Sequence, residues 1–347
     1  MKQEMLSIEE CMKLKDVVFI DVRSPIEFKE ATIPGAVNIP LLDDDERARV
    51  GTIFKQVCPE EAKKVGYEFV KPKLPSIFQE IQGLASRNKN VVLFCWRGGM
   101  RSQSLARYCL EQGLDIPCLM GGYKAYRRLV NAFFNNPENI PEMVVLMGLT
   151  GVGKTMLLHL LAERGLPAID LEGLANNRGS VFGQVHGGVQ PSQKNFEAML
   201  YESIKANNSN YAIVECESRR IGKVFLPEEM FNKMNNGIKI HLYASLDVRV
   251  QRVVEDYAHF PEERLIDAIQ HLIKTLGRQK VESLISLVRQ RKYKRVAAEL
   301  LTNYYDSLYG YPKDRSKEYD LSVQCDDLQR AAAKVHGFLA DKFDVEV

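Results

Sequence analysis

The sequence predicts an α/β protein with two parallel sheets, each covered by helices on both faces. Short apolar runs alternate with amphipathic segments, which is typical of strand–helix units in parallel sheets. Two of these runs, residues 91–95 and 143–147, lead into a glycine-rich loop followed by a helical pattern. A polar, proline-bearing joint separates the two halves, and 347 residues suffice for two separate cores.

The composition is that of an ordinary soluble protein. Hydrophobic residues make up 45% and charged residues 27% of the chain, and no apolar run approaches the roughly 20 residues of a membrane span. The net charge is only +2, so any nucleic-acid contact must come from local patches. The seven cysteines are odd in number and form no CxxC pair. We therefore expect a cytoplasmic protein without a signal peptide, membrane contact, disulfide framework or zinc site.

The first third of the chain reads as short strands and helices in alternation. An additional segment, residues 41–73, carries an acidic run at 43–46 that we expect to be a solvated loop. The other expected elements are a helix from Ser7 to about Lys15, strands over 17–22 and 33–40, a strand over 91–95, a helix over 103–113, a strand from Cys118 and a helix over 126–133.

The CWRGGMRS loop that begins at Cys95 surrounds one sulfur with two glycines and two arginines. Backbone N–H groups and the dipole of the following helix stabilise a thiolate, and Arg97 and Arg101 act in the same direction. With Gly98 and Gly99, these residues predict a nucleophilic cysteine in a pocket that also holds an oxyanion. The plain alternative is a small buried cysteine at the end of a strand.

The second apolar run leads into GLTGVGKT, a complete GxxxxGK[ST] phosphate-binding loop (P-loop) followed by a predicted helix over 156–164. Its glycines let backbone N–H groups approach phosphate oxygens. We expect Lys154 to reach the terminal phosphate and Thr155 to hold a Mg²⁺ ion if one binds. The predicted phosphate-binding residues are Gly148, Thr150, Gly151, Gly153, Lys154 and Thr155.

The rest of the second half is again α/β. Glu215 ends an apolar strand, where many NTPases place a metal-associated aspartate, yet no run here ends in Asp-Glu. A loop that grips phosphates without hydrolysing them is equally consistent with this pattern. The expected elements are strands over 168–171, 211–217, 238–243 and 319–323 and a final helix over 326–339.

Residues 261–308 read as basic helices with tyrosines nearby. Such helices suit contact with a nucleic-acid backbone and stacking on bases, although a solvated helix face explains the composition equally well. The basic residues are Lys274, Arg278, Lys280, Arg289, Arg291, Lys292, Lys294 and Arg295.

Several motifs of the first half resemble a rhodanese domain, in that family's order: DVR at 21–23, IPGAVNIP at 33–40, the Cys95 loop and LMGGY at 119–123. In rhodaneses the loop cysteine carries a transferable sulfur as a persulfide. Asp21 and Arg23 match the first of these motifs, and we expect a structural role for them, with Arg23 pairing with Glu27.

The loop departs from common sulfurtransferases because its Cys-x5-Arg spacing is one residue longer. This spacing also matches the phosphate cradle of cysteine phosphatases, so a phosphatase is an alternative. Against it, Phe94 stands where those enzymes carry a histidine, and the loop offers no aspartate as an acid.

The fusion of both halves resembles the tRNA 2-selenouridine synthase family over nearly the whole chain. The resemblance includes ER at 46–47, RGS at 178–180, QPSQ at 190–193 and ESRRIG at 217–222. It implies a rhodanese-like domain over 1–134, a linker over 135–142 and a P-loop domain over 143–347 that includes the basic helical region at about 261–308. Candidate substrate-binding residues are Trp96, Asp170, Arg178, Glu215 and Arg219.

The resemblance also implies a reaction: selenium replaces sulfur in 2-thiouridine at the tRNA wobble position. The donor would be selenophosphate, and geranyl diphosphate would supply an S-geranyl intermediate. On this interpretation Cys95 takes selenium as a selenenyl sulfide, while Arg97, Arg101 and the loop amides receive the phosphate. No tightly bound cofactor is expected, and a selenophosphate-supplying enzyme is an expected partner. Another sulfurtransferase fused to a P-loop domain remains an alternative, as does a non-catalytic docking module with a nucleotide switch.

Overall fold

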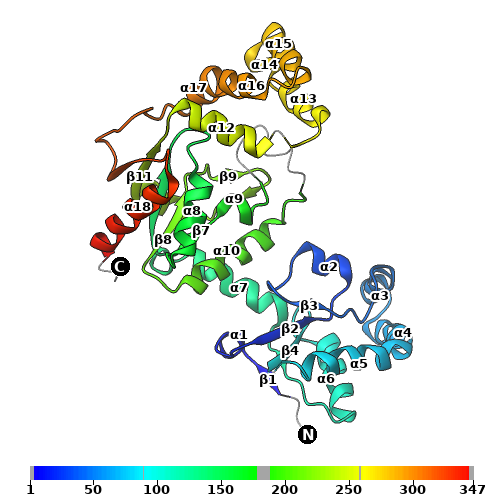
Figure 1. Ribbon diagram of the computed structural model, residues 1–347. Helices are drawn as coiled ribbons and strands as arrows, with labels where there is room; N and C mark the ends of the chain where they lie inside the picture. Colours follow the sequence, from blue (N-terminus) through cyan, green and yellow to red (C-terminus); the bar gives the residue numbers. More distant parts are fainter. Residues whose placement is uncertain (1–3, 89, 178–187, 258, 344–347) are drawn as a thin grey trace. The chain divides into compact units, whose positions relative to one another are not determined.

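The computed structural model describes residues 4–88, 90–177, 188–257 and 259–343 (Figure 1). The chain forms two compact units, one of Met1–Phe133 with Glu197–Met199 and one of Phe134–Phe196 with Leu200–Val347. Each unit contains a five-stranded sheet whose paired strands all run parallel. The predicted α/β class with parallel sheets is therefore confirmed. None of the helices in the described ranges has the length and apolarity of a membrane span.

The sheet of the first unit has the strand order β1-β5-β4-β2-β3, so β4 is its middle strand. Apolar side chains of β2 and β4 and of helices α5 and α6 form its core, because these strands are buried and the helices face them with their apolar sides. The strands are β1 (Met5–Leu6), β2 (Val17–Asp21), β3 (Val37–Asn38), β4 (Asn90–Phe94) and β5 (Cys118–Leu119).

The expected acidic loop is wrong, because the acidic run begins a helix. Asp43 is the N-cap of α3, and its side chain and that of Glu46 form a capping box. Acidic side chains in a first turn satisfy free N–H groups and favour the positive end of the helix dipole. The helices of this unit are α1 (Ile8–Cys11), α2 (Pro25–Glu30), α3 (Asp44–Gln56), α4 (Pro59–Val70), α5 (Leu74–Ala85), α6 (Met100–Glu111) and α7 (Gly122–Phe134).

The sheet of the second unit has the order β12-β11-β6-β8-β7, with β6 in the middle. Strands β6, β8 and β11 are almost entirely buried, and α8 and α18 pack against their apolar side chains. A separate antiparallel pair joins β9 (Arg220–Ile221) and β10 (Val224–Phe225). The sheet strands are β6 (Glu142–Met147), β7 (Ala168–Ile169), β8 (Tyr211–Glu215), β11 (Ile238–Tyr243) and β12 (Leu321–Gln324).

The region expected to be helical, about 261–308, is helical and has a core of its own. Figure 1 shows α13 to α16 gathered in one group beside the end of α12. Three helices of this unit are short: α9 (Leu171–Leu174), α14 (Ile273–Leu276) and α17 (Asp306–Tyr309). The longer helices are α8 (Lys154–Glu163), α10 (Gln193–Asn207), α11 (Glu228–Asn236), α12 (Leu246–Tyr257), α13 (Glu262–Gln270), α15 (Arg278–Arg289), α16 (Tyr293–Leu300) and α18 (Leu328–Phe343).

Candidate functional sites

The Cys95 loop lies at the carboxyl end of β4, the middle strand of the first sheet. Gly99 is the N-cap of α6, which begins at Met100, three residues before the expected start at residue 103. In a parallel sheet this edge is where helix N-termini converge, and it is the usual position of ligand sites. Cys95 is buried, with 4% of its surface exposed.

Hydrogen bonds to its carbonyl groups hold this loop in shape. The amides of Tyr123 and Lys124, at the start of α7, donate to the carbonyls of Cys95 and Trp96 at 2.9 and 3.0 Å. Gln103 Nε2 donates to the carbonyl of Gly98 at 2.7 Å. Of the loop amides, those of Arg97 and Ser102 donate to the Cys95 sulfur.

Two glycines make this close approach possible. Gly98 and Gly122 both have positive φ angles, +62° and +58°. A Cβ at Gly98 would lie 2.3 Å from the carbonyl oxygen of Leu119, and one at Gly122 would lie 2.2 Å from that of Cys95. Any side chain at either position would therefore push the cysteine loop away from α7.

The sulfur has donors that favour its charged form. Burial raises the pKa of the Cys95 thiol, but hydrogen bonds from the Ser102 side chain and amide, the charge of Arg101 and the Arg97 amide outweigh it and lower the pKa below its ordinary value. Ser102 Oγ lies 3.3 Å from Cys95 Sγ. The loop thus stabilises a thiolate, as its composition predicts.

Arg101 is held by a carboxylate that the sequence did not reveal. Its guanidinium binds both oxygens of Glu27 in α2, at 2.6 and 3.3 Å, and Arg47 of α3 reaches the same carboxylate at 3.3 Å. The expected Arg23–Glu27 pair is wrong, because Arg23 instead forms a fully buried ion pair with Asp21 at 2.6 Å. Arg97 is exposed.

Trp96, the residue after Cys95, packs its ring against Tyr123 and Arg23. Its ring lies 5.6 Å from the ring of Tyr123, and the guanidinium of Arg23 lies 4.6 Å from Tyr123 and 5.8 Å from Trp96. Trp96 keeps 37% of its surface exposed. One side of the indole therefore packs within the unit, while enough of it remains accessible for an aromatic or apolar substrate group.

The P-loop lies at the carboxyl end of β6, the middle strand of the second sheet. Gly148, Gly151 and Gly153 have positive φ angles, and Gly153 is the N-cap of α8. Thr150 is part of the loop, and Thr155 follows in the first turn of the helix. The structure thus brings the six predicted phosphate-binding residues together.

Lys154 lies over this loop. Its Nζ donates to the carbonyl of Gly148 at 2.9 Å. Burial lowers the pKa of Lys154, against the attraction of Glu172 and Glu217. An anion in the loop would supply the charge that this buried ammonium lacks.

Two arginines of α12 support the loop from outside. Arg249 Nε donates to the carbonyl of Thr150, and Arg252 donates to that of Val152, each at 2.8 Å. Arg249 also forms a buried ion pair with Asp306 at 2.5 Å. No local sequence signal marks these arginines, because their partners lie about a hundred residues away in the chain.

Carboxylates gather beside Lys154. Glu215 is 1% exposed, one of its oxygens accepts the Glu172 amide at 2.7 Å, and the other has no hydrogen-bond partner within the described part of the chain. Burial raises the pKa of Glu215 well above its ordinary value. Burial and Glu172 raise the pKa of Glu217 to about 8.

The other candidate substrate-binding residues are spread more widely. Asp170 is the N-cap of α9 and lies 2.8 Å from His159, and its charge acts on Glu215. Arg219 is exposed and pairs with Glu228 at 3.3 Å. Arg178 lies outside the described residues.

The orphaned oxygen of Glu215 and the Thr155 hydroxyl are of the type that Mg²⁺ accepts. Within the described ranges, no group of three or more His, Cys, Asp or Glu side chains could hold a metal ion. Mg²⁺ at Thr155 stays a prediction.

Comparison with known proteins places the chain in a family. Residues 7–129 match the model of the rhodanese-like domain, and residues 141–336 match that of the tRNA 2-selenouridine synthase AAA domain. The chain belongs to the tRNA 2-selenouridine synthase family. This confirms the resemblance.

Relatives of this name match most of the chain. The tRNA 2-selenouridine synthase of Shewanella pealeana is 32% identical, over 88% of this chain and 91% of its own length. That of Hydrogenovibrio crunogenus is 34% identical over 88% and 91%, and that of Nitrosomonas europaea is 39% identical over 70% and 64%. The likeness to the first two includes both the rhodanese-like and the P-loop parts.

Proposed function

We propose that this member of the tRNA 2-selenouridine synthase family replaces sulfur by selenium in 2-thiouridine at the wobble position of tRNA. Selenophosphate is the selenium donor, and geranyl diphosphate supplies an S-geranyl intermediate. The protein acts in the cytoplasm and receives selenophosphate from a separate enzyme. The names of the relatives support the reaction, and the buried Cys95 with its lowered pKa is the observation that carries the proposal.

The Cys95 loop suits an oxyanion donor. Loop amides, the start of α6 and the partly engaged Arg101 surround the sulfur, so a selenophosphate group meets hydrogen-bond donors and positive charge there. Trp96, next to the loop and partly exposed, offers a face on which the thiouridine base stacks.

Electron balance constrains what Cys95 does. Holding selenium on sulfur as a selenenyl sulfide would oxidise it and would need an electron acceptor. Attack of the thiolate on phosphorus needs none: a sulfur–phosphorus bond forms, the phosphorus–selenium bond breaks, and selenide leaves with the electron pair. Selenide then displaces geranyl thiolate from C2 of the base, and water releases phosphate from Cys95.

The P-loop suits the diphosphate of the prenyl donor. The sulfur of 2-thiouridine forms a bond to C1 of the geranyl group, the carbon–oxygen bond breaks, diphosphate leaves with the electron pair, and N3 of the base loses its proton to solvent. This step needs the diphosphate to be bound and its developing charge to be stabilised. Lys154, half-buried over the loop, and the glycines at its turns provide both.

The basic helices suit the tRNA backbone. Most of the basic residues predicted to contact tRNA are exposed, whereas Lys280 pairs with Glu299. These side chains are therefore available to phosphates, and their contribution should weaken as salt rises. The exposed residues are Lys274, Arg278, Arg289, Arg291, Lys292, Lys294 and Arg295.

The test is nucleoside mass spectrometry after incubation with 2-thiouridine tRNA, geranyl diphosphate and selenophosphate. We expect 2-selenouridine from the wild type and from Cys58→Ser, and at least about a thousandfold less from Cys95→Ala because the nucleophile is gone. Cys58 is a matched control, since its sulfur caps α4 and serine caps equally well.

Two results would contradict the proposed function. Equal selenation by Cys95→Ala would overturn the role of the cysteine. No modified nucleoside from wild-type protein that binds the tRNA would overturn the proposed reaction and favour a phosphatase. The intact mass of protein mixed with selenophosphate distinguishes a phosphoryl group on Cys95 from selenium.

A further inference from the structure

Tyr309 presents a half-exposed aromatic ring at the end of α17. Its side chain keeps 46% of its surface exposed. The ring is stacked on that of Tyr311, with the two centroids 6.3 Å apart and the two planes inclined by 12°. The hydroxyl of Tyr311 lies 3.3 Å from the sulfur of Cys216, within hydrogen-bond distance. An accessible ring is thus supported by a second ring whose own position is held by a hydrogen bond.

These contacts place the aromatic pair at the start of the P-loop. Cys216 directly follows β8, and its amide donates to the carbonyl of Leu146 in β6 at 2.9 Å. Strand β6 ends at the next residue, and the P-loop begins at Gly148. Through Cys216, Tyr311 and Tyr309 are therefore held at the carboxyl end of β6 and β8, the edge of the sheet from which the P-loop emerges.

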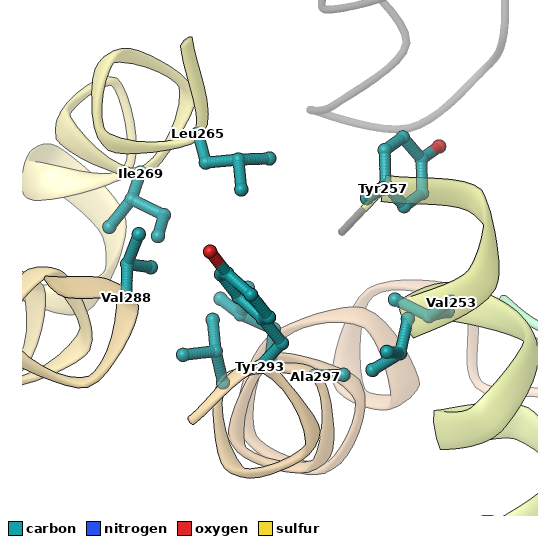
Figure 2. A pocket seen from close by; sticks show the side chains of 10 residues that line it. Val253, Tyr257, Leu265, Ile269, Val288, Tyr293 and Ala297 are labelled. Atoms are coloured by element: carbon teal, nitrogen blue, oxygen red, sulfur yellow. The ribbon is translucent and has the colours of Figure 1, made fainter. Parts of the chain in front are cut away.

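A second set of contacts ties the helix of Tyr309 to the P-loop. Asp306, at the start of α17, forms the buried ion pair with Arg249 of α12, whose Nε donates to the carbonyl of Thr150. Figure 2 shows side chains of α12 and α16 facing one small apolar pocket, so these two helices also pack together further along. The position of α17 beside the P-loop is thus defined from two directions.

The ring of Tyr309 also lies on the side of the loop where Lys154 would reach a ligand. Burial lowers the pKa of Lys154 against the attraction of three nearby groups. Burial raises the pKa of the Tyr309 hydroxyl, and the charges of the same three groups raise it further. These groups are Glu172, Glu217 and Cys216. Since charges act strongly only over short distances in water, Lys154 and Tyr309 both border this one cluster.

The helix that ends in Tyr309 carries basic side chains at its other end. Exposed Lys292, Lys294 and Arg295 lie at the start of α16, and a π-helical turn over Leu301–Tyr305 joins α16 to α17. Such turns are rare and are frequent at functional sites. Fifteen residues separate Lys294 from Tyr309, roughly 22 Å along a helix axis. This length spans about six phosphates of one nucleic-acid strand, so one strand can contact both ends.

A nucleobase suits the position of Tyr309. If the P-loop holds the diphosphate, the atom that receives the prenyl group must lie beside that loop, and bases of single-stranded RNA are commonly held by stacking on aromatic side chains. We propose that Tyr309 stacks on the 2-thiouridine ring while its sulfur is alkylated at the P-loop. This inference rests on the proposed function, in which geranyl diphosphate is a substrate. It gives the base a separate stacking partner for each step, Tyr309 for geranyl transfer and Trp96 for selenium transfer.

The test measures geranyl transfer to 2-thiouridine tRNA by the full chain, without selenophosphate, from the S-geranyl nucleoside formed over time. Tyr309→Ala removes the ring, Tyr309→Leu keeps apolar bulk without an aromatic face, and Tyr309→Phe keeps the face. We expect kcat/KM for the tRNA to fall about tenfold or more in the first two variants and to stay within about twofold of the wild type in the third. Tyr67→Ala, at an exposed tyrosine of α4, is the matched control and should behave as the wild type.

Calorimetry with geranyl diphosphate separates stacking from damage to the P-loop. We expect all four variants to bind geranyl diphosphate as the wild type does, because the ring contacts the base and leaves the loop in place. A loss of transfer that is matched by an equal loss of geranyl diphosphate affinity would mean that the ring only supports the loop, and would overturn the inference. An equal loss in Tyr309→Phe would assign the effect to the hydroxyl group and would also overturn stacking.

The remaining outcomes separate this inference from the proposed function. If the wild type binds both substrates and forms no S-geranyl nucleoside, the geranyl step of the proposed function fails, and the inference fails with it. If the wild type transfers the geranyl group and Tyr309→Leu does so equally well, only the inference is overturned. If Tyr309→Ala does not fold, the comparison of Tyr309→Leu with Tyr309→Phe decides in the same way.

Discussion

The Cys95 loop and the P-loop occupy corresponding places in two parallel sheets, yet one favours the charged form of its central side chain and the other favours the neutral form. Each follows the middle strand of its sheet and leads into a helix N-terminus. Cys95 is buried, and Lys154 is half-buried. Around Cys95 the hydrogen bonds and the charge of Arg101 outweigh burial. They lower the pKa of the thiol and so favour the charged thiolate. Around Lys154 desolvation outweighs the nearby carboxylates. It lowers the pKa of the ammonium and so favours the neutral amine.

This difference means that the Cys95 loop stabilises its nucleophile without a ligand, whereas the P-loop needs a bound anion to stabilise the charge of Lys154. The thiolate has its donors in place, because Ser102 and the loop amides already face it. Lys154 instead donates to the carbonyl of Gly148, a weaker partner than a phosphate. We therefore expect the P-loop to respond to its ligand more strongly than the Cys95 loop does.

The largest effect on ligand binding should come from Lys154→Ala. Removing this partly desolvated ammonium should weaken the binding of inorganic diphosphate and of geranyl diphosphate by about a hundredfold, because a charge-assisted hydrogen bond to the ligand is lost. Calorimetry would measure both affinities, with Lys205→Ala, an exposed residue of α10, as the control. Unchanged affinity would show that the loop binds no diphosphate.

The sequence predicted the loops better than what surrounds them. Cys95 and Lys154 sit in contiguous motifs, and a strand, a glycine turn and a helix define their local geometry. Glu27, which binds Arg101, and Arg249, which binds the Thr150 carbonyl, are 74 and 99 residues from their partners. Such contacts depend on the packing of whole elements and leave no periodic or local signal.

Two expectations for the first unit were wrong: the acidic loop at 43–46 and the ion-pair partner of Arg23. The acidic run at 43–46 has the spacing of a capping box, which Asp43 and Glu46 form, so its charge alone is a poor guide to a solvated loop. The ion pair of Arg23 with Asp21 was missed, since Glu27 lies at the usual helical spacing, whereas burial decides the actual partner.

An intermediate effect should come from Ser102→Ala. Losing the hydroxyl removes a donor to the sulfur, so the pKa of Cys95 should rise and less thiolate should be present at pH 7. We expect iodoacetamide to alkylate Cys95 about tenfold more slowly. Burial raises the pKa of Cys11 and Cys109 to about 11, so these thiols should contribute little at that pH.

Peptide mass spectrometry across pH 5–10 would give the profile. Ser104→Ala, an exposed position on the same helix, is the matched control and should behave as the wild type. A profile for Ser102→Ala that coincides with the wild type would mean that the amides and Arg101 alone stabilise the thiolate.

The smallest effect should come from Glu217→Gln and concerns pH. Because the pKa of Glu217 is raised to about 8, the group is neutral below that pH and ionised above it. Ionisation adds a negative charge near Lys154, so the affinity of the wild type for inorganic diphosphate should fall as pH rises from 7 to 9. The variant lacks this charge, and its affinity should fall about threefold less over the same interval.

Calorimetry at both pH values would measure the slopes, and Glu228→Gln, an exposed carboxylate, should keep the wild-type slope. Equal slopes for Glu217→Gln and the wild type would contradict this prediction. They would mean that ionisation of Glu217 does not change the affinity of the P-loop for diphosphate, and that Lys154 and the ligand set the pH dependence.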